Sequence, residues 1–420
     1  MIIYRNILQL TEQHIVKSSS PFFKECDHLC LKSKELYNSC LYLIRQAYIK
    51  DKINLLYELH SLMKDSSQYK ALPAKVSSTV LLMVQHNFKS YFKATAEYHK
   101  NPAKFLGRPK LPGYLDVNKG RFFVSYTNQA FSKKVFWKSG KILLSKTEIE
   151  FKTKIEDLSS INCVRIIPRD DHFVIEVIYT IPDTNKLTDN QRYASVDLGV
   201  NNLMTVASNC VGLAPVIISG KPLKSVNQFY NKKRAAMQAI LETRNQAKTS
   251  NCLTKLTNKR KRKVDNYMHK ASKELVLHCK KNNINTVVIG KNDNWKQDAS
   301  MSKSSNQGFV SIPHSRLIEM IQYKCEREGI NIIIQEESYT SKACFLTLDH
   351  IPKYKKGETN STEFGGYRES RGMYKVRGEK IRINADVNGS LNILRKAVPN
   401  AFADGIEGIG VCPEVIKISK

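Results

Sequence analysis

The feature that most constrains the fold is a regular alternation of short apolar runs and helical stretches after residue 190. Three runs, ASVDLGV, LMTVASN and APVIIS, follow one another and have the length and the side chains of buried strands. A long helical stretch then extends from about Val226 to Lys281 and leads to a fourth apolar strand, NTVVIG. The pattern predicts a domain in which three strands come first and helices separate the later ones.

The same alternation continues along the chain. A helix, HSRLIEMIQYKCERE, carries its apolar residues in one stripe, and the strand INIIIQ follows it directly. A polar, glycine-rich insertion from about Asp349 to Lys380 precedes a last helix from about Ala385 to Lys396. The predicted order is β-β-β-α-β-α-β, insertion, α. This is the order of a ribonuclease-H-like domain, but the order of elements does not give function by itself.

The first 180 residues have a different pattern. Residues from about Ser20 to His99 indicate helices, and a basic loop from Lys100 to Tyr114 holds three prolines and two glycines that preclude long regular structure. From Arg121 the runs RFFVSYT, VFWK, KILLS, CVRIIP and HFVIEVIYTIP indicate short strands of a small barrel or sandwich. The polar segment from Asp183 to Asn190 is typical of a linker.

Charge is the strongest sign of function. The 420 residues include 67 Lys and Arg against 38 Asp and Glu, a net charge of +29, which favours a polyanionic partner and above all nucleic acid. Ten scattered cysteines, of which only Cys26 and Cys30 lie close together, indicate a reducing interior rather than a disulfide framework. No long apolar run and no signal-peptide pattern occur, so we expect no membrane span and a cytoplasmic location.

The cations are concentrated in the long helical stretch. Between Lys221 and Lys281 there are 17 Lys and Arg and three acids, an excess that favours contact with phosphates over the alternative of a solvated helix face. Tyr230 and Tyr267 are candidates for stacking on bases, although their helical spacing favours the core. The candidate nucleic-acid-binding residues are Lys104, Arg108 and Lys110 in the basic loop, and Lys232, Lys233, Arg234, Lys259, Arg260, Lys261, Arg262 and Lys263 in the helical stretch.

Two aspartates are candidates for catalysis. Asp197 stands at the end of an apolar strand, where a carboxylate needs a hydrogen-bond network or a metal unless it only caps a turn. Asp386 stands in the first turn of the last helix, where an acid also favours helix initiation. In a ribonuclease-H-like fold the first strand and the last helix meet at the carboxyl end of the sheet. Both acids would then converge and hold Mg²⁺ for phosphodiester cleavage.

Several motifs together resemble the TnpB (OrfB) proteins of bacterial insertion sequences, which are RNA-guided DNA nucleases related to the type V CRISPR effectors. They are SVDLGVNNLMTVAS, FLGRPKLPGY, VVIGKNDNWKQ, ESYTSKACF and RGMYKVRGEKIRINADVNGSLNILRK. The resemblance spans nearly the whole chain and is strongest from Val196 to Lys396. It implies an α+β multidomain protein with a helical recognition lobe, a β-barrel wedge domain and a RuvC-like nuclease domain. It also implies a guide noncoding RNA and double-stranded target DNA as partners.

On this resemblance we expect residues 1–19 and 119–184 to form the wedge barrel and 20–118 the recognition domain with its basic loop. Residues 185–400 would form the nuclease domain with an insert at 340–382, and 401–420 a C-terminal tail. We expect a monomer with its RNA, in the bacterial cytoplasm with the nucleoid.

Gly290 departs from the family pattern. In most relatives the strand that here ends at Gly290 ends in a catalytic glutamate, and Asp293 and Asp298 lie beyond it without being obvious substitutes. Either the nuclease is inactive or the carboxylate has moved. The neighbouring strand INIIIQ runs into Glu336 and Glu337, and strand residues alternate in direction, so one of the two would reach over the glycine. We favour relocation, with two Mg²⁺ ions held by both aspartates and one glutamate, over a solvated strand end.

A second departure concerns zinc. Relatives often carry two CxxC pairs after the YTS segment, but this chain has only Cys344 there, with Thr347 in place of its near partner, and its next cysteine is Cys412. We therefore expect no zinc.

The preferred function is an RNA-guided DNA endonuclease of a transposable element. The alternatives are a nuclease-inactive, RNA-guided DNA-binding repressor and a DNA-joining transposase.

Overall fold

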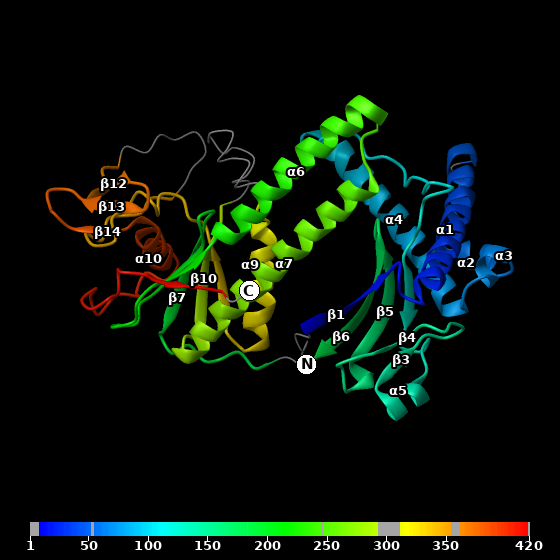
Figure 1. Ribbon diagram of the computed structural model, residues 1–420, viewed down its shortest axis with the longest axis horizontal. Coiled ribbons are helices and arrows are strands. Elements are labelled where there is room, and N and C mark those ends of the chain that lie inside the picture. Colours follow the sequence, from blue (N-terminus) through cyan, green and yellow to red (C-terminus); the bar gives the residue numbers. More distant parts are fainter. Residues whose placement is uncertain are drawn as a thin grey trace. The chain divides into compact units, whose positions relative to one another are not determined.

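The computed structural model describes residues 8–51, 54–182, 184–245, 247–292, 311–353 and 362–418. The chain divides into two compact units, Met1–Pro182 and Asp183–Lys420, whose elements are labelled in Figure 1. Within the described ranges no helix is both long enough and apolar enough to cross a bilayer.

The first unit contains a four-stranded antiparallel sheet in the order β1-β6-β5-β2. The register runs from Leu8 opposite Ile181 to Lys17 opposite His172, so the first strand of the unit pairs with its last along their whole length. A closed barrel is not found among the described residues, because β1 and β2 stand at opposite ends of the strand order. The strands are β1 (Leu8–Lys17), β2 (Val124–Thr127), β5 (Ile161–Pro168) and β6 (His172–Ile181).

Helices cover this sheet in the region where the sequence predicts them. Leu36 and Leu41 of α1 and Val84 and Phe88 of α4 are buried in one core together with sheet residues such as Val177. Apolar residues at helical spacing thus form the core-facing side of each long helix. The helical elements are α1 (Phe23–Asp51), α2 (Leu59–Met63), α3 (Ser67–Lys70), α4 (Ala74–Lys100), η1 (Pro102–Lys104) and η2 (Leu158–Ser160).

The sequence predicts a strand for the run VFWK, but this prediction is wrong. The run is part of helix α5 (Lys133–Ser139). Ser132 caps the helix by accepting a hydrogen bond from the Val135 N–H at 3.3 Å, and Gly140 ends it with a left-handed φ of 64°. These two caps outweigh the strand preference of the apolar residues between them. The two strands that follow, β3 (Lys141–Leu143) and β4 (Glu150–Lys152), form a separate small sheet.

The second unit is built on a six-stranded sheet in the order β11-β10-β7-β8-β9-β15. β7, β8 and β9 are antiparallel neighbours, whereas β10 and β11 run parallel to β7. The predicted order of elements is confirmed from β7 to α10, and β15 adds a parallel strand beside β9. The strands are β7 (Tyr193–Leu198), β8 (Asn202–Ser208), β9 (Val216–Ser219), β10 (Thr286–Gly290), β11 (Asn331–Gln335) and β15 (Glu414–Ile416).

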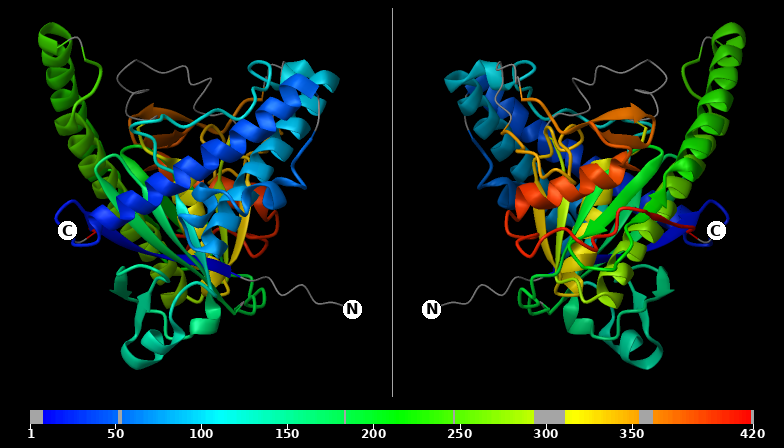
Figure 2. Two further views of the ribbon diagram at one scale, coloured as in Figure 1. Left: turned by 90° about the vertical axis from the view of Figure 1, so that its right-hand side faces the viewer. Right: turned by 90° about the vertical axis from the view of Figure 1, so that its left-hand side faces the viewer.

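Helices pack on both faces of this sheet (Figure 1). On one face α7 and α9 bury residues such as Met268 and Leu317 against Val287 and Ile289 of β10. On the other face α10 packs against Val288, because successive strand residues point to opposite sides. The helices are α6 (Lys221–Asn245), α7 (Asn251–Lys281), α9 (His314–Arg327) and α10 (Ala385–Ala397), and Figure 2 shows α6 and α7 extending beyond the sheet.

The insertion before α10 ends in a small antiparallel sheet of β12 (Gly366–Ser370), β13 (Met373–Val376) and β14 (Arg382–Asn384). β14 runs directly into α10, so this sheet lies next to the first turn of that helix. Cys344 is buried in an apolar cluster with Tyr374 and Val376, and the hydroxyl of Thr347 donates a hydrogen bond to Asp349 at 2.6 Å.

Candidate active site

Asp197 lies on β7, on the face of the sheet that α10 covers. Small residues bring the helix close to the strand: the Ser390 hydroxyl lies 3.0 Å from that of Ser195 and donates to the Ser195 carbonyl at 3.1 Å. Gly389 is adjacent, and a Cβ added to it would stand 3.1 Å from Oδ2 of Asp197. The absence of a side chain at Gly389 therefore leaves room for the carboxylate between strand and helix.

Asp386 is held in the first turn of α10 by two neighbouring elements. Asn384 caps the helix by accepting hydrogen bonds from the N–H groups of Asp386 and Val387 at 3.0 and 3.1 Å. Asn202 of β8 donates to Oδ2 of Asp386 at 2.7 Å, and Arg368 of β12 lies 3.5 Å from Oδ1. The carboxylate is thus fixed at the end of the sheet where β7 also ends.

The two aspartates are close enough to interact electrostatically. Burial and, to a smaller extent, the charge of Asp386 raise the pKa of Asp197 to about 7, and Arg368 opposes the shift. A neighbouring carboxylate charge disfavours the ionised state of a buried acid. A cation placed among them would relieve this repulsion.

Glu337 occupies the space beside Gly290. β10 ends at Gly290, which pairs with Gln335 of β11, and the chain then turns so that the Glu337 N–H donates to Asn292 at 3.0 Å. A Cβ added at Gly290 would stand 2.5 Å from Oε2 of Glu337 and 2.6 Å from Cδ1 of Ile393. A side chain at residue 290 and Glu337 in this position therefore exclude each other.

The Glu337 carboxyl lacks the partners that a buried acid normally has. Its Oε2 is buried and accepts no hydrogen bond among the described residues. Burial, with the charges of Asp197 and Glu336, raises the pKa of Glu337 to about 8. Because buried polar atoms are nearly always paired, this oxygen is free to accept a contact from a ligand such as a cation.

Glu336 has a different environment. Its side chain is 44% exposed and pairs with Lys396 at 2.6 Å, and it accepts a hydrogen bond from the Ser338 N–H at 2.7 Å. Burial alone would raise the pKa of Glu336, but the hydrogen bonds from Lys396 and Ser338 outweigh it and lower the pKa. This carboxylate is thus already neutralised by the protein.

The donors match magnesium in chemical type. Carboxylate oxygens are its preferred protein ligands. Such oxygens are supplied here by Asp197, Glu337 and Asp386, and the charge of a bound cation would offset the repulsion described above. Within the described ranges, no three His, Cys, Asp or Glu side chains lie close enough to enclose an ion. Magnesium does not require such a cage, because it keeps several waters and is commonly bound by one or two carboxylates together with substrate phosphates. Asp293 and Asp298, which the sequence does not favour as substitutes for the glutamate missing at Gly290, lie outside the described residues.

Comparisons with known proteins agree with this architecture. Residues 176–296 match the OrfB family described as a probable transposase, and residues 314–393 match the Cas12f1-like TNB domain. A TnpB-like protein of Methanocaldococcus jannaschii is 28% identical over 122 residues, 29% of this chain, and a TnpB-like protein of the Acidianus two-tailed virus is 25% identical over 215 residues, 49% of this chain. The predicted resemblance to the TnpB (OrfB) family is confirmed.

The matched regions span 44% and 42% of these two TnpB-like relatives, so less than half of the length of either is compared. A solved structure of Cas12f1 with a single guide RNA and target DNA covers 89% of this chain and 82% of its own, with 18% identity and a TM-score of 0.52. At that identity the likeness concerns the fold, a mixed α+β arrangement.

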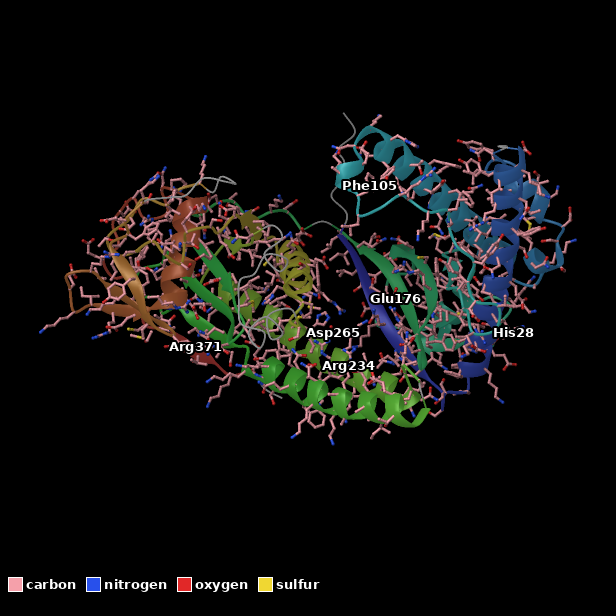
Figure 3. All side chains as sticks on the ribbon, turned by 90° about the horizontal axis from the view of Figure 1, so that it is seen from above. His28, Phe105, Glu176, Arg234, Asp265 and Arg371 are labelled. Atoms are coloured by element: carbon pink, nitrogen blue, oxygen red, sulfur yellow. The ribbon has the colours of Figure 1, made fainter. Side chains whose placement is uncertain are left out.

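The predicted nucleic-acid-binding cations lie mostly on the surface. Lys232, Lys233 and Arg234 are exposed on α6, where Figure 3 shows Arg234, and Lys259, Lys261, Arg262 and Lys263 are exposed on α7. Arg260 is only partly exposed, because it donates to Asn227 and to the Ser311 carbonyl, each at 2.7 Å. In the basic loop Lys104 pairs with Glu97 at 2.7 Å, while Arg108 and Lys110 are exposed.

An exposed aromatic residue of α6 was not among the predicted ones. Tyr267 donates to the Ser219 carbonyl and packs against the core, and the Tyr230 hydroxyl contacts Thr257 at 3.1 Å. Phe229, directly before Tyr230, is 61% exposed. The signal in the sequence that could have identified Phe229 is that an apolar residue of a strongly basic helix lies outside the core-facing stripe of that helix.

Proposed function

We propose that this chain is an RNA-guided DNA endonuclease that cleaves with Asp197, Asp386 and Glu337. The observation that carries the proposal is the unpartnered Oε2 of Glu337 in the space beside Gly290, electrostatically coupled to Asp197. The sheet order of the second unit, with β10 and β11 parallel to β7, supports a RuvC-like assignment of that unit. The first unit would serve as the recognition and wedge part.

Each residue has a distinct role in this proposal. Asn202 and Arg368 hold Asp386 in position from two elements, and the narrow gap beside Gly389 orients Asp197. Glu337 replaces the carboxylate that relatives carry at the position of Gly290, whereas Glu336 is bound to Lys396 and remains outside the site. Bound Mg²⁺ would stabilise charge on the scissile phosphate and activate the attacking water.

Guide RNA and double-stranded DNA are the partners that the charge of the chain favours. A net charge of +29 with exposed cations along α6 and α7 suits a phosphate backbone, which supplies affinity without sequence preference. The solved Cas12f1 that resembles this chain holds a guide RNA and a target DNA. In such complexes base pairing reads the sequence, and the protein reads backbone shape.

The test is cleavage of a matched plasmid by protein coexpressed with the RNA from its element, in Mg²⁺ and in EDTA. Glu337→Gln removes one charge with almost no change in shape and should reduce cutting at least about a hundredfold, as expected when a metal-ion contact is lost. Glu336→Gln is the matched control and should cut nearly as well as the unchanged protein. Equal loss in both variants would refute the assignment of Glu337.

A pair of compensating substitutions sharpens the test. Glu337→Gly removes one of the two side chains that crowd residue 290, so that only Ile393 has to shift. Gly290→Glu in that background returns the carboxylate to β10, where relatives carry it. Recovery of cutting in the double variant, relative to Glu337→Gly alone, would show that the site needs one carboxylate at this place and not one particular residue.

A second function is favoured by a specific observation, that β10 ends in Gly290 and so offers no carboxylate at the end of the strand itself. A nuclease-inactive, RNA-guided DNA-binding protein would bind the matched plasmid with its RNA and leave it uncut in Mg²⁺. The same plasmid assay, read as a mobility shift beside the cleavage gel, separates the two functions.

A further inference from the structure

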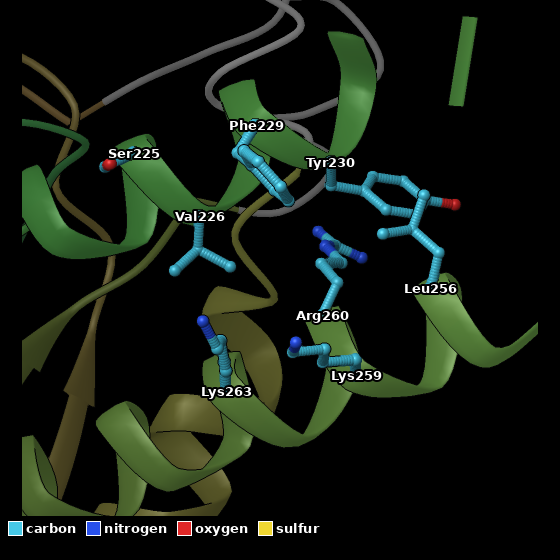
Figure 4. Close-up of a pocket in the computed structure, with 8 residues that line it drawn as sticks. All are labelled: Ser225, Val226, Phe229, Tyr230, Leu256, Lys259, Arg260 and Lys263. Atoms are coloured by element: carbon cyan, nitrogen blue, oxygen red, sulfur yellow. The ribbon is translucent and has the colours of Figure 1, made fainter. Parts of the chain in front are cut away.

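We propose that the pocket between α6 and α7 binds one unpaired nucleotide, with its base stacked on Phe229 and its neighbouring phosphates on Lys259 and Lys263. This inference rests on the proposed function and adds to it a defined site for single-stranded nucleic acid outside the acid cluster. Figure 4 shows the pocket, which has a volume of about 280 Å³. It is lined by Ser225, Val226, Phe229, Tyr230, Leu256, Lys259, Arg260 and Lys263.

Phe229 provides the stacking surface. Its ring is 61% exposed, although its neighbours on α6, Leu223 and Val226, pack on the core. In Figure 4 the ring projects into the pocket from α6 toward the cations of α7. Phe229 is not among the residues that form the apolar core of this unit, and an aromatic face is what every nucleobase stacks on.

Arg260 forms a fixed wall of the pocket. Its guanidinium lies 5.5 Å from the centroid of the Tyr230 ring and is held by its hydrogen bonds to Asn227 and Ser311. A side chain fixed in this way loses little entropy when a ligand binds. The pocket is therefore already shaped before a nucleotide enters.

Lys259 and Lys263 provide the charge. They stand one helical turn apart on α7, both are exposed, and neither pairs with an acid in the part of the chain that the structure describes. No described Asp or Glu lines the pocket. Two unpaired ammonium groups beside an aromatic ring match a base with its two flanking phosphates.

A second cavity extends this path. It has a volume of about 990 Å³, shares Val226, Lys259 and Lys263 with the first, and also has no described carboxylate in its lining. Its other cations are Lys221, Arg262, Lys270 and Lys417. The two cavities form a continuous basic path along α6 and α7, as a strand of several nucleotides requires.

The aromatic ring selects for an unpaired strand. In a duplex the faces of the bases are covered by their neighbours, so a ring inside a pocket cannot stack on them without unpairing. A duplex would need cations alone. The combination of a ring and cations is typical of sites that bind single strands with little sequence preference.

The test measures binding of fluorescent oligouridylate and oligothymidylate by anisotropy at several salt concentrations. Phe229→Ala should weaken binding by about five- to a hundredfold, the usual cost of losing one stacked base. It should leave the slope of log K against log salt unchanged, because no charge is lost. Phe229→Trp should keep the affinity. Ile240→Ala, which removes another exposed apolar side chain of α6 outside the pocket, is the matched control and should have no effect.

Substitution of the two lysines should change the salt dependence of binding. Replacing both Lys259 and Lys263 by Ala should reduce the salt slope by about 1.4, since each lost phosphate contact on a single strand changes it by about 0.7. Oligonucleotides with a central 5-iodouracil should crosslink on irradiation to the peptide that contains Phe229. The RNA and DNA arms show which strand the pocket prefers.

The outcomes separate the inference from the proposed function. Normal affinity of Phe229→Ala, or crosslinks only outside α6 and α7, would overturn the nucleotide pocket and leave the nuclease proposal intact. An effect of the lysine substitutions without one of Phe229→Ala would also overturn it, because the site would then bind backbone alone. A protein that binds neither oligonucleotide would contradict the proposed function itself.

Discussion

Glu337→Gln should stabilise the metal-free protein at neutral pH, because the glutamate is buried close to two other acids, Asp197 and Glu336. The pKa of Glu337 rises from 4.5 to about 8 on folding, mainly through burial. A carboxyl whose pKa is raised in the folded state lowers the free energy of unfolding as the pH rises from 4.5 to 8, because the unfolded chain releases its proton first. At pH 7 this loss is about 3 kcal/mol.

Gln is neutral at every pH and similar in shape, so Glu337→Gln should remove this loss. We expect the melting temperature of the variant to exceed that of the unchanged protein by about 6–12 °C at pH 7. The difference should nearly vanish at pH 4.5. The measurement is a series of thermal or urea unfolding curves between these pH values in EDTA.

Glu336→Gln should behave in the opposite way. Hydrogen bonds from Lys396 and Ser338 lower the pKa of Glu336 in the folded state, so this carboxylate stabilises the protein above its unfolded pKa and loses the effect as the pH falls. The substitution should therefore lower the melting temperature at neutral pH. Parallel pH profiles for the unchanged protein and Glu337→Gln would refute the reasoning, because they would show that Glu337 ionises normally in the folded state.

Three further substitutions test the geometry of the site. Gly290→Ala places a methyl group against Glu337 and should reduce cleavage at least about tenfold, with a stability cost of about 1–3 kcal/mol, measured by plasmid cutting and urea unfolding. Arg368→Gln removes the cation that lowers the pKa of the β7 aspartate, so the pH of half-maximal cleavage should rise in a pH–rate profile. Gly389→Ala favours the helix by about 1 kcal/mol but crowds the same aspartate, so it should reduce cutting without lowering the melting temperature.

Each substitution has a matched control. Gly113→Ala adds the same methyl group where no atom lies within 4 Å, and should leave cutting unchanged. Arg382→Gln removes an arginine of the same small sheet, on β14, that pairs with Glu369 and not with the acids of the site. Equal effects of Arg368→Gln and Arg382→Gln on the pH profile would contradict a specific role for Arg368.

The fold of the second unit was predictable because its strands are short, apolar and separated by polar runs. The resulting order placed Asp197 and Asp386 at one end of the sheet, and the structure brings them into electrostatic contact. The choice between Glu336 and Glu337 was not predictable from alternation along a strand. It depends on the turn after β11, where Asn292 holds the Glu337 backbone and Lys396 binds Glu336, and both contacts join residues far apart in sequence.

Other features also depend on contacts that the sequence does not display. The three residues of β15 give too short an apolar signal, yet they pair with β9 in the main sheet. The run VFWK has strand-forming residues, but the caps at Ser132 and Gly140 make it helical. The exposure of Phe229 could not be predicted either. The spacing of apolar residues in a helix does not show which of them the neighbouring helix leaves exposed to solvent.

On the proposed function, the spacing of the three acids along the chain sets when activity can begin during synthesis. Asp197, Glu337 and Asp386 come from a strand, a turn and the last long helix, and Asp386 lies 189 residues after Asp197. At ordinary rates of translation the ribosome needs about 10 to 40 s to cover that distance. On the proposed function, a nascent or prematurely terminated chain carries α6 and α7, and can hold nucleic acid, well before it can cut any.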